Sequence, residues 1–166
     1  MLVNYLNRLG WFLGLLLLQA LILNHVHLWG VATPFLYIYL LLTLESDTSP
    51  GTLMLWAFFL GLAVDTFSDT PGMNAASAVL LAFVRPYCLR LFMPRDSVDT
   101  IRPSLRTLGM LPFLKYAAVC VLIHHTMLML MEFFSLLHAG LLLLHILACS
   151  LLTLACIMAV EGIRKH

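Results

Sequence analysis

Long apolar stretches separated by short polar segments fill the chain. A helix that crosses a bilayer needs about 20 mostly apolar residues, within a range of about 17–25. The pattern therefore predicts an all-α fold: a polytopic membrane protein with about six transmembrane helices in a compact bundle. The third apolar run is short, so its helix has to continue through Ser68 or lie in a locally thinned bilayer. The predicted spans are residues 9–26, 28–44, 52–68, 73–92, 108–131 and 136–160.

The composition supports the bilayer as the solvent of this chain. Of the 166 residues, 62% are hydrophobic and 10% are charged, and the mean hydropathy is +0.99. Soluble domains carry about 25% charged residues. A soluble domain of this length cannot hide so much apolar surface, so residues 1–166 are predicted to form a single transmembrane domain. The formal net charge of +1 does not indicate nucleic-acid binding.

The basic residues are distributed asymmetrically. With six spans and a cytoplasmic N-terminus, the predicted outer loops contain Asp65, Asp69 and Glu132 but no lysine or arginine. Because Lys and Arg are enriched in cytoplasmic loops, we expect both termini in the cytoplasm. Arg85 and Arg90 lie in the last third of the fourth span, where long cationic side chains can snorkel to the headgroups. The nine basic residues are Arg8, Arg85, Arg90, Arg95, Arg102, Arg106, Lys115, Arg164 and Lys165.

Catalytic and metal-binding motifs are missing from the sequence. His124 and His125 lie in the fifth predicted span, but adjacent helical residues point about 100° apart and cannot face one ion. There is no HExxH and no CxxC, so interhelical hydrogen bonds are expected instead of a metal site. The four cysteines read as small apolar residues in helices. Without a GxSxG motif or a P-loop, the sequence predicts neither an enzyme nor a cofactor site.

The segment 61–76 joins two apolar runs through a polar turn. Ala57, Gly61 and Asp65 share one helix face at spacing i, i+4, i+8, and small residues there let a neighbouring helix approach closely. Asp65 is therefore expected to point into the bundle. Two interpretations of it stay open. Asp65 is a binding, gating or proton-carrying group, or it is a helix-end carboxylate that caps the neighbouring turn or lies in headgroup water.

The turn itself has a recognisable chemistry. Pro71 and Gly72 fit the two central positions of a type II turn, because proline presets φ and glycine supplies a positive φ. Asn74 is then placed to cap the N-terminus of the next helix. Asp69 lies on the turn and is expected to be structural or solvated. A cation site formed with Asp65 has weak support, because two carboxylates lack further oxygen ligands.

Two further motifs each have two interpretations. Gly10 and Gly14 form a GxxxG motif, which favours helix packing with a partner or, as the preferred alternative, within this chain. The polar loop 93–106 contains Arg95, Arg102 and Arg106. Its composition favours a topogenic loop that contacts anionic lipid over the alternative, a cytoplasmic docking surface for a partner.

The hairpin around Asp65 resembles the rod shape-determining protein MreD family, in the form seen in Bacteroides-type members. In that family a Gly-Leu-x-x-Asp run ends one helix, and Ser, a small residue, Pro, Gly and a helix rich in small residues follow. Asp69 stands where the family usually has glycine, and the turn is shorter. The matching residues are Gly61, Leu62, Asp65, Ser68, Pro71, Gly72 and Ala75.

The resemblance implies a non-enzymatic inner-membrane scaffold of the cell-elongation machinery. Such a protein would bind MreC and, through it, the MreB filament and the peptidoglycan polymerase–transpeptidase pair. The fold would be similar to the substrate-binding S-components of energy-coupling factor vitamin transporters. A vitamin-binding subunit is thus the alternative, and it requires a polar, aromatic-lined outer cavity. The predicted outer loops are short and supply few polar residues for such a cavity.

Overall fold

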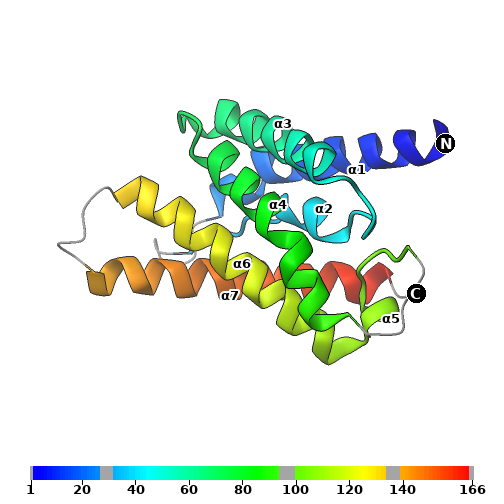
Figure 1. The fold of residues 1–166 in the computed structure, drawn as a ribbon. Coiled ribbons are helices and arrows are strands. Elements are labelled where there is room, and N and C mark those ends of the chain that lie inside the picture. Colours follow the sequence, from blue (N-terminus) through cyan, green and yellow to red (C-terminus); the bar gives the residue numbers. More distant parts are fainter. Residues whose placement is uncertain (1, 27–31, 94–99, 134–138, 165–166) are drawn as a thin grey trace.

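The computed structural model describes residues 2–26, 32–93, 100–133 and 139–164. Every regular element in these ranges is a helix (Figure 1). In chain order the helices are α1 (Leu2–Leu21), the short 3-10 helix η1 (Leu23–His25), α2 (Ile38–Thr43), α3 (Pro50–Ser68), α4 (Met73–Phe92), α5 (Leu105–Leu108), α6 (Met110–Phe133) and α7 (Ala139–Arg164).

Four of the described helices, α3, α4, α6 and α7, are long and apolar enough to cross a membrane. The chain is therefore a polytopic helical membrane protein, but the described residues do not contain six spanning helices. The first predicted span corresponds to a shorter apolar stretch, Leu9–His25. The third continues through Ser68, which is one of the two alternatives expected for its short apolar run. Outward-facing side chains such as Phe59, Tyr87 and Leu151 are large, apolar and exposed, as expected for contact with lipid.

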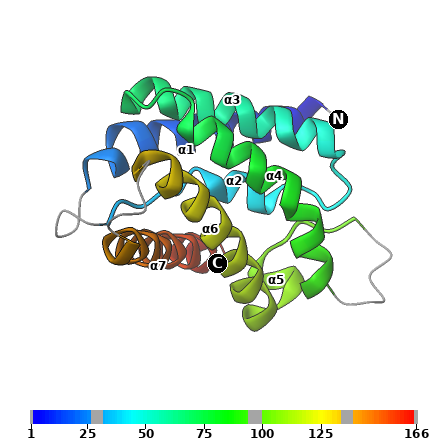
Figure 2. The ribbon, with the colours of Figure 1, turned by 60° about the vertical axis from the view of Figure 1, so that its left-hand side comes forward.

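The helices pack in an order that follows the chain. Helix α3 packs chiefly on α4, α4 on α6, and α6 on α7, while α1 lies along α3. Figure 2 shows α2 enclosed among the longer helices. Both termini lie at the same end of the bundle as α5, which we call the terminal end (Figure 1). The turn between α3 and α4 lies at the opposite end, the turn end (Figure 1).

The prediction of a spanning helix at 28–44 is wrong. Residues 33–37 form no helix, and α2 is only six residues long. Pro34 explains the interruption, because it has no amide hydrogen and disfavours a helical conformation at Thr33. The segment is nevertheless deeply buried: Tyr37 and Leu42 have no exposed surface. We call residues 32–44 the embedded segment.

Side chains from other helices satisfy the non-helical backbone of the embedded segment. The Gln19 amide donates to the Pro34 carbonyl at 2.9 Å, and its oxygen accepts from the Leu36 amide at 2.8 Å. The Thr153 hydroxyl accepts from the Phe35 amide at 3.0 Å. Irregular backbone is tolerated at membrane depth only where protein or water supplies such partners. Helices α1 and α7 therefore hold this segment in an irregular conformation.

The fifth predicted span, 108–131, corresponds to α6, and a separate short helix, α5, precedes it. Helix α5 ends at Leu108, and α6 begins at Met110. Gly109 between them has φ 83° and ψ 164°, a backbone conformation that is available to glycine but costly for other residues. The predicted boundary at 108 is therefore correct to within two residues, but it overlooked the separate short helix.

Candidate functional site

Gly61 lets α3 and α4 touch through their backbones. A Cβ atom added to Gly61 would lie 2.5 Å from the Cα of Ala75 and 2.7 Å from the carbonyl oxygen of Asn74. Real Cβ contacts are not this short, so any other residue would push the helices apart. Ala57, one turn before, is fully buried on the same face. The small-residue face expected from the sequence therefore lies against α4.

Asp65 caps the start of α4 from the end of α3. Its side chain is 4% exposed. The Oδ1 atom accepts from the Thr70 hydroxyl at 2.7 Å and from the backbone and side-chain amides of Asn74 at 2.9 and 3.0 Å. The Oδ2 atom accepts from the Ala75 amide at 2.9 Å. A carboxylate at a helix N-terminus also interacts favourably with the helix dipole. This geometry matches the capping interpretation of Asp65.

The prediction that Asn74 caps α4 is wrong. The N-cap residue is Gly72, which has φ 79° and ψ 6°, the values expected at the second central position of a type II turn. The amide of Asn74 is instead one of the donors that Asp65 accepts. Asp69 is exposed, has φ 52°, and ends α3 in the left-handed conformation that a glycine there would adopt more easily.

A chain of hydrogen bonds leads from Asp65 into the centre of the bundle. The Tyr37 hydroxyl donates to Asn74 Oδ1 at 3.2 Å, and it lies 2.7 Å from His124 Nε2. Because the single Tyr37 hydrogen is directed to Asn74, the His124 Nε2 atom has to carry a hydrogen and donate it to Tyr37. His124 Nδ1 is then a bare acceptor, and it is buried without a partner. Every donor in the chain points towards the Asp65 carboxylate.

His125 is part of a second interhelical link. Its Nδ1 atom lies 2.8 Å from the Val121 carbonyl, which requires a hydrogen on Nδ1. The Nε2 atom then accepts from the Thr153 hydroxyl at 3.2 Å. The expectation of an interhelical hydrogen bond is confirmed for His125, whereas His124 bonds to Tyr37 in the non-helical part of the embedded segment. Within the described residues, no group of three or more His, Cys, Asp or Glu side chains is arranged to hold a metal ion.

Arg85 is buried and does not snorkel, so that prediction is wrong. Its side chain is 1% exposed in the interior of the bundle. Nη2 donates to the carbonyls of Leu42, at 3.3 Å, and of Leu44. Nε donates to the Tyr116 hydroxyl at 3.1 Å, which in turn donates to Leu42 at 3.1 Å. Arg85 thus caps the C-terminus of α2, where backbone carbonyls lack helical partners. Arg90 is exposed.

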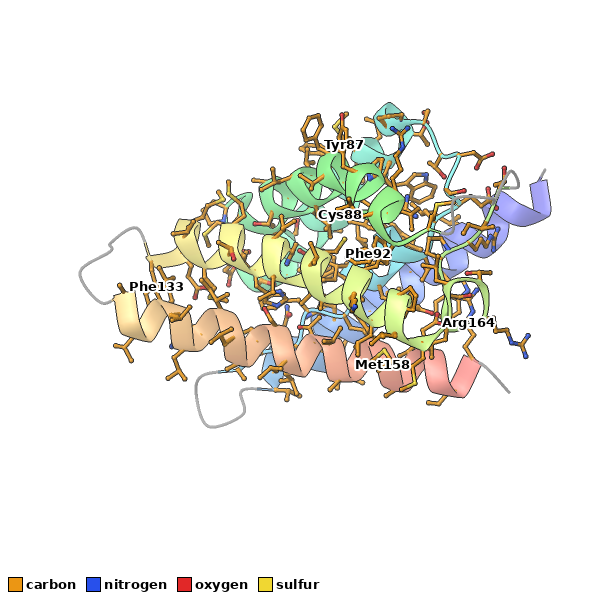
Figure 3. All side chains as sticks on the ribbon, turned by 60° about the horizontal axis from the view of Figure 1, so that its bottom comes forward. Tyr87, Cys88, Phe92, Phe133, Met158 and Arg164 are labelled. Atoms are coloured by element: carbon orange, nitrogen blue, oxygen red, sulfur yellow. The ribbon has the colours of Figure 1, made fainter. Side chains whose placement is uncertain are left out.

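A third polar cluster lies at the terminal end. Glu161 on α7 is 3% exposed. Its Oε1 atom accepts from the Tyr39 hydroxyl, and its Oε2 atom accepts from the Leu105 amide at 3.0 Å, at the start of α5. Arg164, labelled near the end of α7 in Figure 3, places Nη1 3.7 Å from Glu161 Oε1. The guanidinium also lies 5.5 Å from the centre of the Trp11 ring. The cluster therefore joins α1, α2, α5 and α7.

The arginines of the predicted docking surface differ in their surroundings. Arg102 forms an ion pair with Glu45, with 2.7 Å between Nη2 and Oε1. Beside it, Ser46 donates its amide to the Ile101 carbonyl at 2.9 Å and accepts the Ile101 amide on its hydroxyl at 3.1 Å. Arg106 is exposed on α5. Arg95 lies outside the described residues. Arg102 therefore fastens its own loop to the α2–α3 connection.

The GxxxG motif of α1 does not mediate packing within this chain. Gly10 and Gly14 are exposed, and a Cβ atom added to either would meet no atom within 4 Å. The favoured alternative from the sequence is therefore wrong. The face of α1 that packs on the bundle consists of larger residues such as Leu15, Leu16 and Gln19.

The turn end contains a cavity of about 510 Å³ that the sequence did not predict. Six parts of the chain line it: η1, the start of the embedded segment, the end of α3 with its turn, and the adjoining ends of α4, α6 and α7. Asn74 belongs to both the cavity wall and the Asp65 cluster. The acidic residues of this end were visible in the sequence. Their arrangement around a common space depends on elements more than 100 residues apart, such as Asn24 and Cys149.

Comparison with known proteins does not identify this chain. No protein-family model matches the chain, and no curated protein or solved structure matches it. Functional conclusions therefore depend on the residues, their geometry and the sequence resemblance.

Proposed function

We propose that this chain is a non-enzymatic scaffold of the cell-elongation (rod) complex, which binds MreC and supports peptidoglycan synthesis and cell shape. The observation that supports the proposal is the construction of the α3–α4 hairpin. Gly61, Asp65 and Gly72 belong to the motif that resembles the MreD family, and each has a defined task in this hairpin. Gly61 permits the backbone contact, Asp65 caps α4, and Gly72 makes the turn.

A scaffold needs a rigid shape more than it needs a reactive group. The hairpin motif provides rigidity, because the Asp65 carboxylate accepts four hydrogen bonds from the neighbouring turn and helix. A carboxylate engaged in this way is poorly placed to serve as a nucleophile or a general base. This arrangement favours a structural function over the binding, gating or proton-carrying interpretation of Asp65.

The proposed location is the bacterial inner membrane, with both termini in the cytoplasm. Both termini lie at the terminal end (Figure 1). The exposed basic residues lie between the last turn of α4 and the second turn of α6, whereas the exposed acids Asp69 and Glu132 border the turn end. These basic residues are Arg90, Arg102, Arg106 and Lys115. This distribution fits the enrichment of Lys and Arg on the cytoplasmic side. Reporter fusions at the C-terminus and within the 69–72 turn test the orientation.

The proposed partners are MreC within the membrane and, indirectly, the MreB filament and the peptidoglycan polymerase–transpeptidase pair. Arg95, Arg102 and Arg106 remain candidates for cytoplasmic docking, and Arg102 also pairs with Glu45. Replacing the three arginines together by glutamine is expected to reduce recovery of a cytoplasmic partner without changing membrane insertion. Inverted or failed insertion would instead support the topogenic interpretation of the loop.

Affinity purification of the tagged full-length chain from its native membrane tests the scaffold proposal. Two matched glycine variants on α3 sharpen the test: Gly61→Ala forces α3 and α4 apart, whereas Gly51→Ala adds a methyl group in open space. We expect MreC with the native chain and with Gly51→Ala, and less MreC with Gly61→Ala. Asp65→Ala is likewise expected to weaken recovery more than Asp69→Ala. Failure to recover MreC with the native chain would contradict the proposal.

The second candidate is a substrate-binding subunit of a vitamin transporter. The cavity of about 510 Å³ favours it, because small-molecule sites are typically clefts of about 300–1,000 Å³. Such a subunit would recover an ATPase pair with a membrane coupling protein, and it would retain a vitamin detectable by mass spectrometry. The same purification therefore separates the two candidates.

A further inference from the structure

The cavity at the turn end has the dimensions and the mixed lining of a ligand site. Its walls combine amide and hydroxyl groups, such as those of Asn24 and Thr70, with the aromatic rings of Phe35 and Phe67. Ligand sites commonly join a mostly apolar surface to a few polar groups that orient the bound molecule. The α3–α4 turn, whose residues line this cavity, lies at the end of the bundle remote from both termini (Figure 1).

Besides the two histidines His25 and His145, the described lining of this cavity contains two acidic residues and no lysine or arginine. The carboxylates of Asp69 and Glu132 line it, and neither has a hydrogen-bond or ion-pair partner among the described residues. Asp65 contributes a third negative charge immediately behind the wall residue Asn74. No lysine or arginine occurs in residues 9–84 or 116–163, the ranges that contain every described lining residue. The low-dielectric surroundings of a membrane bundle strengthen this negative potential compared with open water.

The apolar part of the lining also suits a cation. The faces of aromatic rings attract cationic groups electrostatically, and the attraction strengthens when the cation is partly desolvated. Phe35 and Phe67 supply such rings, and Met73 and Met129 supply adaptable thioether surface. An anion would find no lysine or arginine in the described lining. A bare metal ion would find no cluster of three or more ligating side chains among the described residues.

We infer that the cavity binds a small organic cation, in which an amine or quaternary ammonium group is attached to an apolar body. The ammonium group lies near Asp69 and Glu132 at the cavity rim, and the apolar body lies against Phe35 and the methionines. This inference goes beyond the scaffold function and does not depend on it. Loss of MreC binding would leave it intact, as would recovery of MreC without any bound molecule.

Benzyltrimethylammonium is a suitable probe for the full-length protein in detergent or nanodiscs. Neutral benzyl alcohol and anionic phenylacetate serve as matched ligands of similar size. Isothermal titration calorimetry at low ionic strength is expected to detect the cation and neither of the other two. Added salt is expected to weaken binding, because exposed carboxylates are screened. Equal binding of the three ligands, or no binding of the cation, would overturn the inference.

Isosteric neutralisation locates the site. In the double variant Asp69→Asn/Glu132→Gln both changes are at exposed side chains, and asparagine still tolerates the left-handed conformation of residue 69. We expect it to bind the cation about tenfold more weakly, which corresponds to about 1.4 kcal/mol. Asp47→Asn, an exposed acid outside the cavity lining, serves as the control and is expected to bind normally.

The variant experiment has two outcomes that overturn the inference. Unchanged affinity in the double variant would mean that the cation binds elsewhere. Equal weakening by Asp47→Asn would mean that the net surface charge of the protein, and not this cavity, determines the affinity. Thermal unfolding of each variant, followed by circular dichroism, confirms that the protein is folded when it is titrated. If the double variant proves unfolded, the single variants Asp69→Asn and Glu132→Gln are titrated separately with the same criteria.

Discussion

Asp65 and Arg85 are both buried charges, and the bundle stabilises them in opposite ways. Asp65 accepts hydrogen bonds from amides at the start of α4, while Arg85 donates to carbonyls at the end of α2. Neither forms an ion pair with another described residue. A charged side chain at the bilayer centre costs about 2.5–3.5 kcal/mol on insertion scales. Helix termini of the appropriate polarity offset that cost here in place of a counter-ion.

The two sites differ in the sequence separation between the charged residue and its hydrogen-bond partners. The donors to Asp65 are five to ten residues away in sequence, so this site closes a local hairpin. The backbone carbonyls that accept from Arg85 are 41 and 43 residues away, so this site fixes the embedded segment against α4. The comparison indicates that one buried charge sets a turn and the other holds a non-helical segment inside the bundle.

Arg85→Leu is expected to have the largest effect on stability. It leaves the Leu44 carbonyl without its donor and the Leu42 carbonyl with Tyr116 alone. From the orphaned carbonyl and the lost hydrogen bonds of a charged group, we expect a loss of about 3–5 kcal/mol in the free energy of unfolding. Unfolding by sodium dodecyl sulfate, followed by circular dichroism, measures the change. Arg90→Leu, at an exposed position on the same helix, is the control and should change stability little. Similar losses in the two variants would remove the distinction between buried and exposed arginine.

Asp65→Asn is expected to have the next largest effect. The asparagine amide turns an NH₂ group towards donors that need an acceptor, so at least one of them is left unpaired. We expect a loss of about 2–3 kcal/mol from the weakened cap and the orphaned donor. The same unfolding assay measures it, with Asp69→Asn as the exposed control. If Asp65→Asn proves more damaging than Arg85→Leu, the hairpin contributes more to stability than the embedded segment.

Gly61→Ala tests the local site by geometry without changing charge. The added methyl group would lie 2.5 Å from backbone, which cannot move without displacing a helix. Overpacking of this kind typically costs about 1–3 kcal/mol, and we expect about 1–2 kcal/mol here. Gly51→Ala on the same helix should leave the unfolding midpoint unchanged or raise it slightly, since alanine favours helix. A loss of stability in Gly51→Ala alone would contradict this account.

Asp69→Gly is expected to have the smallest effect. Glycine removes the cost of the left-handed conformation at φ 52° but loses more conformational entropy on folding. The two effects nearly cancel, so we expect a change below about 0.5 kcal/mol, which a thermal unfolding midpoint will register. A large destabilisation would mean that the Asp69 carboxylate has a structural partner in addition to its position at the cavity.

The local hairpin could be predicted from sequence because its determinants are close together. Apolar length located α3 and α4, the spacing of Ala57, Gly61 and Asp65 indicated the buried face, and Pro71-Gly72 located the turn. The assignment of the cap to Asn74 was wrong because the helix begins earlier: Gly72 is the N-cap residue of α4, and the Asp65 carboxylate accepts the amides of Asn74 and Ala75.

The embedded segment could not be predicted from apolar length. A buried irregular segment and a buried helix have the same hydrophobic composition, and only Pro34 argued against a helix. Arg85 was expected at the headgroups because its depth was judged from its own helix, without knowledge of the carbonyls that approach it. The cavity was not predicted either, since its walls meet only after elements from both halves of the chain have packed.

The embedded segment also constrains the order in which the protein can be completed. A chain synthesised from its N-terminus produces residues 32–44 well before Arg85 and long before Thr153. Until then, the Phe35 amide and the Leu44 carbonyl lack their native partners and need water or other temporary partners. Residues 32–44 can therefore settle at their final depth only after α7 has entered the membrane, which makes the last helix a requirement for maturation of one of the first segments.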